Sequence, residues 1–398
     1  MATITAISSP FSARVNRIEV SATIAMTAEA AKLRAKGVDL RDLCMGEPHF
    51  NTPQHVKDAG IKAIQENFTK YTGVSGIPEL RKAIVKRHAE DFGSDYKPDE
   101  AVASTGGKQA LFNAVQVLVD HGDEVIVPVP YWVSFKDIVE YAGGKCVFVD
   151  GDEEQDFRLT AKMIERAVTS RTKAIILNTP CNPSGAVMSA DDLRDVVLMA
   201  HRRGIYVVSD ECYVYLNYTG DIQSAGSIHE AKEHLVIVGS LSKTYAMTGW
   251  RSGYALGPAT VISEISKLQS QSTSNPASMV QKAAVAALEG PQDCIQEFRA
   301  DYVRLRDQVL ADLAKIPGIR CAKPQGAFYV YPNISAYLGR SGLKSSSDVA
   351  NRLLHEAHIV TVPGEAFGTQ EHIRLSYATS SKALTEALDR MRNFFASV

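Results

Sequence analysis

The chain has no apolar run long enough to cross a bilayer, no Cys-x-x-Cys pair and no excess of charge of either sign. Its formal net charge is −2 over 398 residues, so nothing indicates a nucleic acid or an anionic membrane as a partner. A membrane-spanning helix needs about 18 or more consecutive apolar residues, which this sequence does not contain. We therefore expect no membrane segment and substrate recognition by individually placed charges.

The cysteines are few and scattered, and their spacing matches neither a set of zinc ligands nor a disulfide framework. They are Cys44, Cys146, Cys181, Cys212, Cys294 and Cys321. We expect reduced, mostly buried thiols, no metal site and a cytoplasmic protein.

The first eighteen residues, MATITAISSPFSARVNRI, contain two arginines and no acidic residue. A transit peptide has this character, but usually with more arginine. We expect instead an N-terminal arm that lies on a partner subunit.

Helical stretches alternate with short apolar runs between about residues 78 and 257. Most of the runs are apolar throughout, which is typical of strands covered by helices on both faces. The runs are AVAST, EVIVPVP, KCVFVD, KAIILN, YVVSD, LVIVGS and SGYALG. This alternation predicts an α/β fold with a mostly parallel central sheet flanked by helices.

After Gly290 the pattern changes. Apolar residues at steps of three or four predict a long amphipathic helix, and they are Phe298, Tyr302, Leu305, Val309 and Leu313. The strands GAFYVYP and HIRLSYA and two more helices follow. We expect a second, smaller α/β domain here that also takes in a helix predicted from Ser21 to Gly37.

The expected division is therefore into three segments. Residues 1–50 form the N-terminal arm and the first part of the small domain, 51–290 the large domain, and 291–398 the C-terminal part of the small domain.

Polar groups follow several of the predicted strands, and each has a structural alternative. Gly106 and Gly107 precede a helix whose free N–H groups can seat a phosphate or carboxylate, or they serve only a tight turn. The rigid turn NTPCNPSG presents Asn182 into a crevice, or it is only a loop. Asp210 needs a cationic or donor partner, or it caps a helix. Lys243 follows an apolar strand, where a buried ammonium is costly unless it forms an imine with a carbonyl.

The sequence does not match either of two common nucleotide-binding motifs. The sequence around Gly106 does not match GxGxxG, and no acidic residue follows at the expected offset. GSLSKT lacks the glycine that a phosphate-binding loop requires before its lysine, since Ser242 stands there.

Taken together, these stretches resemble the fold-type I pyridoxal-phosphate enzymes, specifically the class I aminotransferases. SLSKTYAMTGWRSGY, NPSG and the SDE that precedes Tyr213 carry the resemblance, which extends from SATIAM to RLSYA. It implies a large domain that binds pyridoxal 5'-phosphate and a ping-pong transamination between an amino acid and a 2-oxo acid. It also implies a homodimer with shared active sites.

The resemblance assigns roles around the cofactor ring. Lys243 would be the Schiff-base lysine and the general base. Asp210 would pair with the pyridinium nitrogen, Asn182 and Tyr213 would hydrogen-bond the phenolic oxygen, and Trp132 would stack on the ring. An ordinary core tryptophan is the alternative for Trp132. The remaining groups would hold the phosphate, and they are Ser240, Arg251, the backbone at Gly106, Gly107 and Lys108, and Tyr71 of the partner subunit.

The resemblance also assigns the substrate contacts. Arg374 would bind the α-carboxylate through its planar fork, with the backbone of Gly46 assisting beside Trp132 and Asn182. Lys108 in GGKQ is similar to the prokaryotic-type aspartate aminotransferases, in which this lysine reaches the distal carboxylate. The hydroxyls of Ser21 and Thr23 would assist it. Aspartate with 2-oxoglutarate is therefore the expected pair.

Three alternatives remain. Relatives that accept prephenate tend to carry a lysine two residues before the serine of SAT, where this chain has Glu19, so prephenate or aromatic amino acids are a second preference. A pyridoxal-phosphate lyase is a third option, disfavoured by Arg374 and Lys108. A regulatory role is the last, disfavoured because the whole set of site residues is present.

Overall fold

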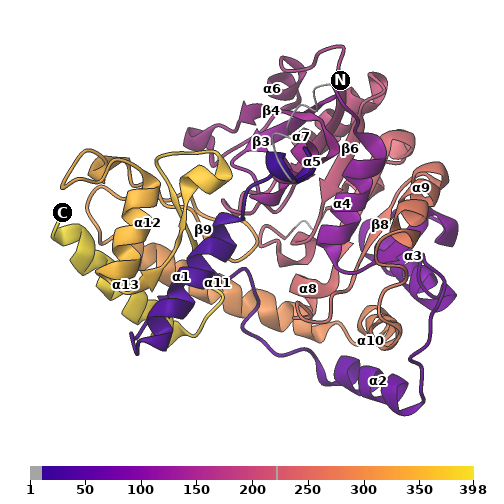
Figure 1. The fold of residues 1–398 in the computed structure, drawn as a ribbon, viewed down its shortest axis with the longest axis horizontal. Helices are drawn as coiled ribbons and strands as arrows, with labels where there is room; N and C mark the ends of the chain where they lie inside the picture. The colour runs from indigo at the N-terminus through magenta and orange to yellow at the C-terminus, as the bar shows by residue number, and fades with distance from the viewer. Residues whose placement is uncertain (1–10, 221–222) are drawn as a thin grey trace, which may run out of the picture.

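The computed structural model describes residues 11–220 and 223–398. Within them, seven strands form one large sheet (Figure 1) in the order β2-β8-β7-β6-β5-β3-β4. The strands are β2 (Ala101–Ser104), β3 (Glu124–Val129), β4 (Lys145–Asp150), β5 (Thr172–Asn178), β6 (Tyr206–Asp210), β7 (Leu235–Ser240) and β8 (Gly253–Leu256). They coincide with the apolar runs of the sequence, which confirms the predicted sheet.

The sheet is mostly parallel, as predicted. The neighbours from β4 through β3, β5 and β6 to β7 are all parallel, whereas β8 is antiparallel to both β7 and β2. Parallel strands end at the same edge, so the last residues of β5, β6 and β7 (Asn178, Asp210 and Ser240) lie at one edge of the sheet.

The antiparallel strand β8 begins at that same edge. Ser240, the last residue of β7, lies opposite Gly253, the first residue of β8. The short connection between them contains Lys243 and Arg251, so both cations stay near the ends of the parallel strands.

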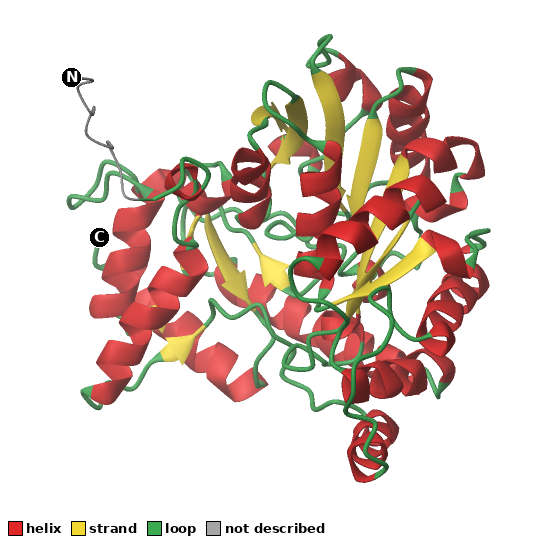
Figure 2. Cartoon of the chain, turned by 45° about the vertical axis from the view of Figure 1, so that its right-hand side comes forward, coloured by secondary structure: helices red, strands yellow, loops and turns green. Residues whose placement is uncertain are grey.

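Helices cover both faces of the large sheet (Figure 2). Successive strand residues enter two separate cores, because strand side chains alternate between faces: Val207 joins the core beneath α3, α7 and α10, and Val208 the core beneath α4, α5 and α9. The helices in this part are α2 (Gln54–Gln65), α3 (Pro78–Phe92), α4 (Gly107–Leu118), α5 (Ser134–Ala142), α6 (Ala161–Glu165), α7 (Ala190–Arg202), α8 (Leu241–Thr244), α9 (Ala259–Ser270) and α10 (Ser278–Glu289).

The C-terminal part builds a second core. Helix α11 (Asp293–Leu313) buries all five apolar positions that the sequence predicted. It packs with α13 (Ser381–Ala396) and with the antiparallel sheet β11-β12-β9. The remaining elements here are α12 (Ser346–His355), β9 (Tyr329–Val330), β10 (Ile359–Val360), β11 (Val362–Pro363) and β12 (Ile373–Ser376).

The N-terminal helix joins this second core. Helix α1 (Ala22–Ala35) begins directly after Ser21, as predicted, and contacts β10 and β11. Strand β1 (Arg41–Asp42) pairs in parallel with β10. Chain segments more than 300 residues apart in the sequence are thereby joined in one structural unit.

The described part of the N-terminal arm lies on its own chain. Arg17 Nη1 donates a hydrogen bond of 3.1 Å to Glu140 O, and the N–H of Glu19 donates one of 3.2 Å to Asp137 Oδ1, both on α5. The expected contact of this arm with a partner subunit stays a prediction. Residues 1–10 of that prediction lie outside the described residues.

Within residues 11–220 and 223–398, no helix is both long and apolar enough to span a bilayer. In the same ranges, no group of three side chains that could bind a metal ion lies together. All six cysteines fall in these ranges and are free. Cys44 and Cys146 are buried, and the other four are partly exposed.

Candidate active site

A cavity of about 250 Å³ opens where the parallel strands of the large sheet end and the small domain covers them. It is lined by Ser21, Thr23, Ile24, Gly46, Gly107, Lys108, Trp132, Val133, Ser134, Asn178, Asn182, Asp210, Cys212, Tyr213, Ser240, Ser242, Lys243, Arg251, Tyr329 and Arg374. The structure thus brings together all of the predicted site residues except Gly106 and Tyr71.

Lys243 lies on the short helix α8, directly after β7. Its Nζ donates a hydrogen bond to the carbonyl oxygen of Gly46. Burial lowers the pKa of this ammonium below its ordinary value, and the guanidinium groups of Arg251 and Arg374 lower it further against the opposing effects of Cys212 and Glu47. The neutral amine is therefore easier to reach here than in water.

Asp210 ends β6 and is buried. Its Oδ1 accepts a hydrogen bond of 3.1 Å from the N–H of Cys212. Burial raises the pKa of the carboxyl group to about 6, although this N–H and the charge of Lys243 oppose the shift. A cationic group placed against Asp210 would favour the ionised carboxylate.

Glycines shape an anion cradle at the start of α4. Gly106 has a φ of 84°, and a Cβ on it would lie 2.7 Å from Arg251 Nη2. A Cβ on Gly107 would lie 3.0 Å from Ser240 Cβ. A Cβ on Gly253 would clash with the N atom of Gly107. The close packing directs helix N–H groups, a hydroxyl and a guanidinium at one place, which suits a phosphate.

Gly106 does not itself line the cavity, but a side chain there would displace the Arg251 guanidinium. Contact of its backbone with a phosphate stays a prediction.

Arg374, on β12, is only 2% exposed. Its Nη1 donates a hydrogen bond of 2.9 Å to Asn182 Oδ1, and its Nη2 donates one of 2.6 Å to the carbonyl oxygen of Cys44. Its Nε has no hydrogen-bond partner among the described residues. A buried guanidinium with donors to spare is suited to a carboxylate.

Asn178 organises the turn that carries Asn182. The N–H of Asn182 donates to Asn178 Oδ1 at 2.8 Å, and Asn178 Nδ2 donates to the carbonyl oxygen of Asp210 at 3.0 Å. The amide of Asn178 therefore joins the ends of β5 and β6 to the turn.

Lys108 and Trp132 lie together in the cavity. Lys108 Nζ is 4.8 Å from the centroid of the Trp132 ring, a cation–π distance. Burial and the nearby charge of Arg251 lower the pKa of Lys108, against the attraction of Asp137. Ser21 precedes α1, but its hydroxyl makes no capping hydrogen bond with that helix.

Tyr71 does not reach the cavity of its own chain. It is 91% exposed on the surface, so any contact with a phosphate requires a second subunit.

Seven residues that line the cavity were not predicted from the sequence, namely Ile24, Val133, Ser134, Asn178, Cys212, Ser242 and Tyr329, and two of them, Asn178 and Tyr329, make hydrogen bonds that organise the site. Asn178 stands in the quoted turn NTPCNPSG, four residues before Asn182, and its position at a strand end was the available signal. Tyr329 is one of three aromatic residues in GAFYVYP, and nothing in that run distinguishes it. Its hydroxyl lies 2.8 Å from the hydroxyl of Tyr213.

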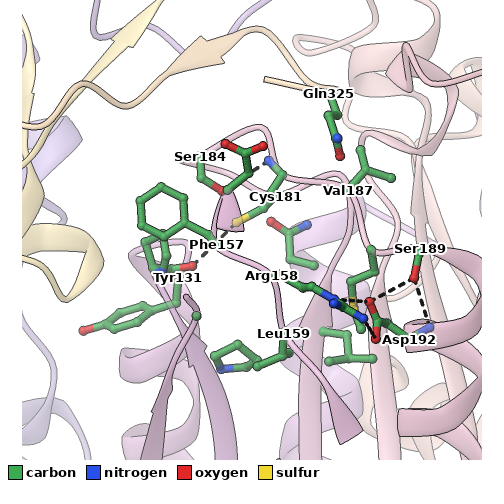
Figure 3. Close-up of a pocket in the computed structure, with 18 of the residues that line it drawn as sticks. Tyr131, Phe157, Arg158, Leu159, Cys181, Ser184, Val187, Ser189, Asp192 and Gln325 are labelled. Carbon is green, nitrogen blue, oxygen red and sulfur yellow. Dashed lines mark hydrogen bonds and ion pairs between the residues drawn. The ribbon is translucent and has the colours of Figure 1, made fainter. Parts of the chain in front are cut away.

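A second, larger cavity of about 500 Å³ (Figure 3) shares one lining residue with the first, Asn178. Arg158 and Asp192 form a two-bond ion pair in it, at 2.9 and 3.1 Å. Cys181 Sγ is 3.5 Å from the carbonyl oxygen of Pro130. Because this cavity contains neither the lysine nor the anion cradle, we take the smaller cavity as the candidate active site.

Comparison with known proteins agrees with this geometry. The model of the family "Aminotransferase class I and II" matches residues 38–391. An aspartate aminotransferase of Geobacillus stearothermophilus is 44% identical, over 96% of this chain and 98% of that protein. An aspartate/prephenate aminotransferase of Nitrosomonas europaea is 41% identical, over 97% and 99%.

Among solved structures, the aspartate aminotransferase of Thermus thermophilus with maleate superposes with a TM-score of 0.92 at 41% identity, covering 97% of this chain and 99% of that one. The family match over most of the chain, the full-length relatives and the shared fold agree with one another. The chain is therefore an enzyme of the class I and II aminotransferase family.

Proposed function

We propose that this enzyme transfers the amino group of L-aspartate to a 2-oxo acid such as 2-oxoglutarate, with pyridoxal 5'-phosphate as cofactor. One observation carries the proposal: Lys243, Asp210, an anion cradle and two further cations, Arg374 and Lys108, line a single cavity. The cations match the two carboxylates of a dicarboxylic substrate. Several of the related proteins are named aspartate aminotransferases.

The residues of the cavity fit the cofactor. The start of α4 with Ser240 and Arg251 would hold its phosphate. Asp210, a buried carboxyl with a raised pKa, would gain from a cationic ring nitrogen. Tyr213 and Asn182 would bind the phenolic oxygen, and Trp132 would cover the ring. When bound, this cofactor supplies a cationic ring that withdraws electrons from the substrate's Cα.

The protein's own part in the reaction centres on Lys243. Its Nζ would hold the cofactor at rest and, once displaced by the substrate's amino group, would take the Cα proton as a general base. The lowered pKa of Lys243 favours the neutral amine that this step requires. Because the amino donor's product leaves before the acceptor binds, the kinetics would be ping-pong.

Arg374 and Lys108 would orient the substrate. The Arg374 fork would bind the α-carboxylate near Gly46, and Lys108 with Ser21 and Thr23 would bind the distal one. Prephenate is the second candidate, since related proteins are named for it. The residue that the sequence singled out, Glu19, is bonded to Asp137 through its N–H and lies 3.7 Å from Lys136 Nζ.

We further propose a homodimer with shared active sites. Exposed Tyr71 supports it, as do Ile61 and Ile64, two exposed apolar residues on α2. We retain the division into residues 1–50, 51–290 and 291–398, with the cofactor bound by the middle segment.

The test is a pair of absorption spectra of the cofactor-loaded protein, before and after addition of L-aspartate without an oxo acid. We expect the visible band to disappear and the band of the aminated cofactor to appear. Lys243→Ala abolishes this change, because no other amine would take the proton at this position, while Lys323→Ala, an exposed lysine outside the cavity, leaves it intact. Conversion with phenylalanine but not aspartate would refute the substrate, and a wild type without a visible band would refute the role of Lys243.

A further inference from the structure

Tyr329 lies beside the substrate arginine because of the register of the small sheet. Strand β9 pairs with β12 so that Tyr329 is opposite Ser376. Arg374 is two residues from Ser376 on the same strand, and residues two apart point to the same face. Tyr329 and Arg374 are therefore diagonal neighbours on the face that meets the cavity.

The ring of Tyr329 contacts the Arg374 guanidinium. Arg374 Cζ lies 4.5 Å from the centroid of this ring and 5.0 Å from that of Phe367. Contact of this kind stabilises a guanidinium without using its N–H groups. The ring thus fixes Arg374 while leaving the donors of its fork for a carboxylate.

The hydroxyl of Tyr329 lies at a junction of the active site. It is 2.8 Å from Tyr213 Oη, and a Cβ on Gly46 would lie only 2.7 Å from it. Gly46 also accepts the hydrogen bond of Lys243 Nζ. The absence of a side chain at residue 46 therefore lets the tyrosine hydroxyl and the lysine approach the same short segment.

We propose that Tyr329 is a positioning residue that joins the carboxylate site at Arg374 to the cofactor-side hydroxyl of Tyr213. This proposal rests on the proposed function. Its ring aligns Arg374, and its hydroxyl donates to Tyr213 Oη, which leaves the Tyr213 proton free for the phenolic oxygen of the cofactor. Donation in this direction also strengthens the second hydrogen bond, since linked hydrogen bonds polarise one another.

The ring and the hydroxyl group of Tyr329 can be tested separately. Tyr329→Phe removes only the hydroxyl, and Tyr329→Leu removes the ring as well. Tyr377→Phe is the matched control, because Tyr377 is equally buried and its hydroxyl donates to Ala327 O outside the cavity. Maleate serves as an unreactive dicarboxylate, and its dissociation constant is measured by calorimetry on the cofactor-free protein.

For Tyr329→Phe we expect maleate affinity within about twofold of wild type but an aspartate half-reaction about tenfold slower, in line with the loss of one hydrogen bond. The pH midpoint of the visible absorption of the loaded enzyme moves upward, because the negative phenolic oxygen loses support. Tyr329→Leu adds a loss of maleate affinity of about tenfold, the effect of losing a desolvated cation–π contact.

A Tyr329→Phe variant that matches Tyr377→Phe in both the absorption midpoint and the rate would overturn the role of the hydroxyl. Wild-type maleate affinity in a folded Tyr329→Leu would overturn the role of the ring. If Tyr329→Leu does not fold, Tyr329→Phe still decides the role of the hydroxyl, and Tyr329→Met, a flexible apolar side chain without a ring, replaces it as the test of the ring. Failure of the proposed function looks different, because the wild type itself would then not convert aspartate.

Discussion

At the scale of single residues, Glu211 lies next to Asp210 and is buried without a charged partner. Its Oε1 accepts hydrogen bonds from Ser209 Oγ at 3.0 Å and from the N–H of Ala225 at 2.9 Å. His88 Nε2 lies 3.9 Å from its Oε2, but burial lowers the pKa of His88 to about 3, so this ring is neutral near pH 7. Burial raises the pKa of Glu211 to about 7.

The raised pKa of Glu211 predicts how the stability of the cofactor-free protein depends on pH. A carboxyl that holds its proton more tightly in the folded chain stabilises the fold below its unfolded pKa and loses that contribution as the pH rises through the folded one. The window here runs from about 4.5 to about 7. We expect Glu211→Gln to gain free energy of unfolding relative to wild type across this window, on the order of 3 kcal/mol.

Urea denaturation of both proteins at pH 4.5, 6 and 8 measures this difference. The exposed change Glu233→Gln serves as the control, because it alters the same net charge at the surface. An offset between Glu211→Gln and wild type that stays constant with pH would contradict the burial argument.

A site residue could be predicted from the sequence only where a recognisable motif surrounds it. Lys243, Asp210 and Asn182 stand in short polar stretches at strand ends, and the structure brings all three to one cavity. Tyr329 stands in an aromatic run, and only its pairing opposite Ser376 places it beside Arg374. Strand register joins residues about 45 positions apart, and a single sequence does not contain that information.

At the scale of secondary-structure elements, the close approach of α4 to the β7–β8 connection depends on glycine. Gly106 and Gly93 both adopt positive φ, of 84° and 70°, but the space around them differs. A Cβ at Gly93, after α3, would meet nothing within 4 Å, whereas one at Gly106 would meet the Arg251 guanidinium.

Alanine substitutions at Gly106 and Gly93 distinguish the effect of backbone strain from the effect on the geometry of the active site. We expect Gly106→Ala and Gly93→Ala each to lower the free energy of unfolding by about 1 kcal/mol, because alanine disfavours positive φ. Only Gly106→Ala should also weaken cofactor binding, by about tenfold or more, since it displaces a guanidinium that would hold the phosphate. Thermal melts and a fluorescence titration with pyridoxal 5'-phosphate measure the two effects, and equal cofactor affinity in the two variants would be inconsistent with the cradle.

The strands of the large sheet were predictable from the sequence, but the order in which they lie side by side was not. All seven apolar runs became strands of the large sheet, because a run buried on both faces is apolar throughout. The position of β8 between β2 and β7, antiparallel to both, has no local signal. It depends on how the β7–β8 connection turns back, and the apolar content of the strand is the same in either direction.

At the scale of the whole molecule, the proposed dimer makes each active site depend on two chains. Lys243 lines the cavity of its own chain, whereas Tyr71 is exposed on the surface. Tyr71→Ala and Lys243→Ala would therefore damage different halves of the same site. A mixed dimer of the two variants would contain one intact site and one with both defects.

We expect each variant alone to have little activity. After the two are unfolded and refolded together in equal amounts, about half of the dimers should be mixed, and activity should return to about a quarter of the wild-type value. Activity assays before and after mixing, with size-exclusion chromatography as the check on assembly, test this. No recovery in correctly assembled mixed dimers would argue against a shared site.

The segment around residues 43–46 contacts the rest of the site through its main chain. Leu43 O accepts from the N–H of Ser376 at 2.7 Å, Cys44 O accepts from Arg374 and Gly46 O accepts from Lys243. Every amino acid offers the same carbonyl, so a substitution at residue 43 or 44 leaves these hydrogen bonds intact, whereas inserting or deleting one residue shifts them all. The segment is therefore constrained in its number of residues as well as in its side chains, since Leu43 and Cys44 are buried and a Cβ on Gly46 would meet the Tyr329 hydroxyl; over evolution it should resist the insertion or deletion of even one residue.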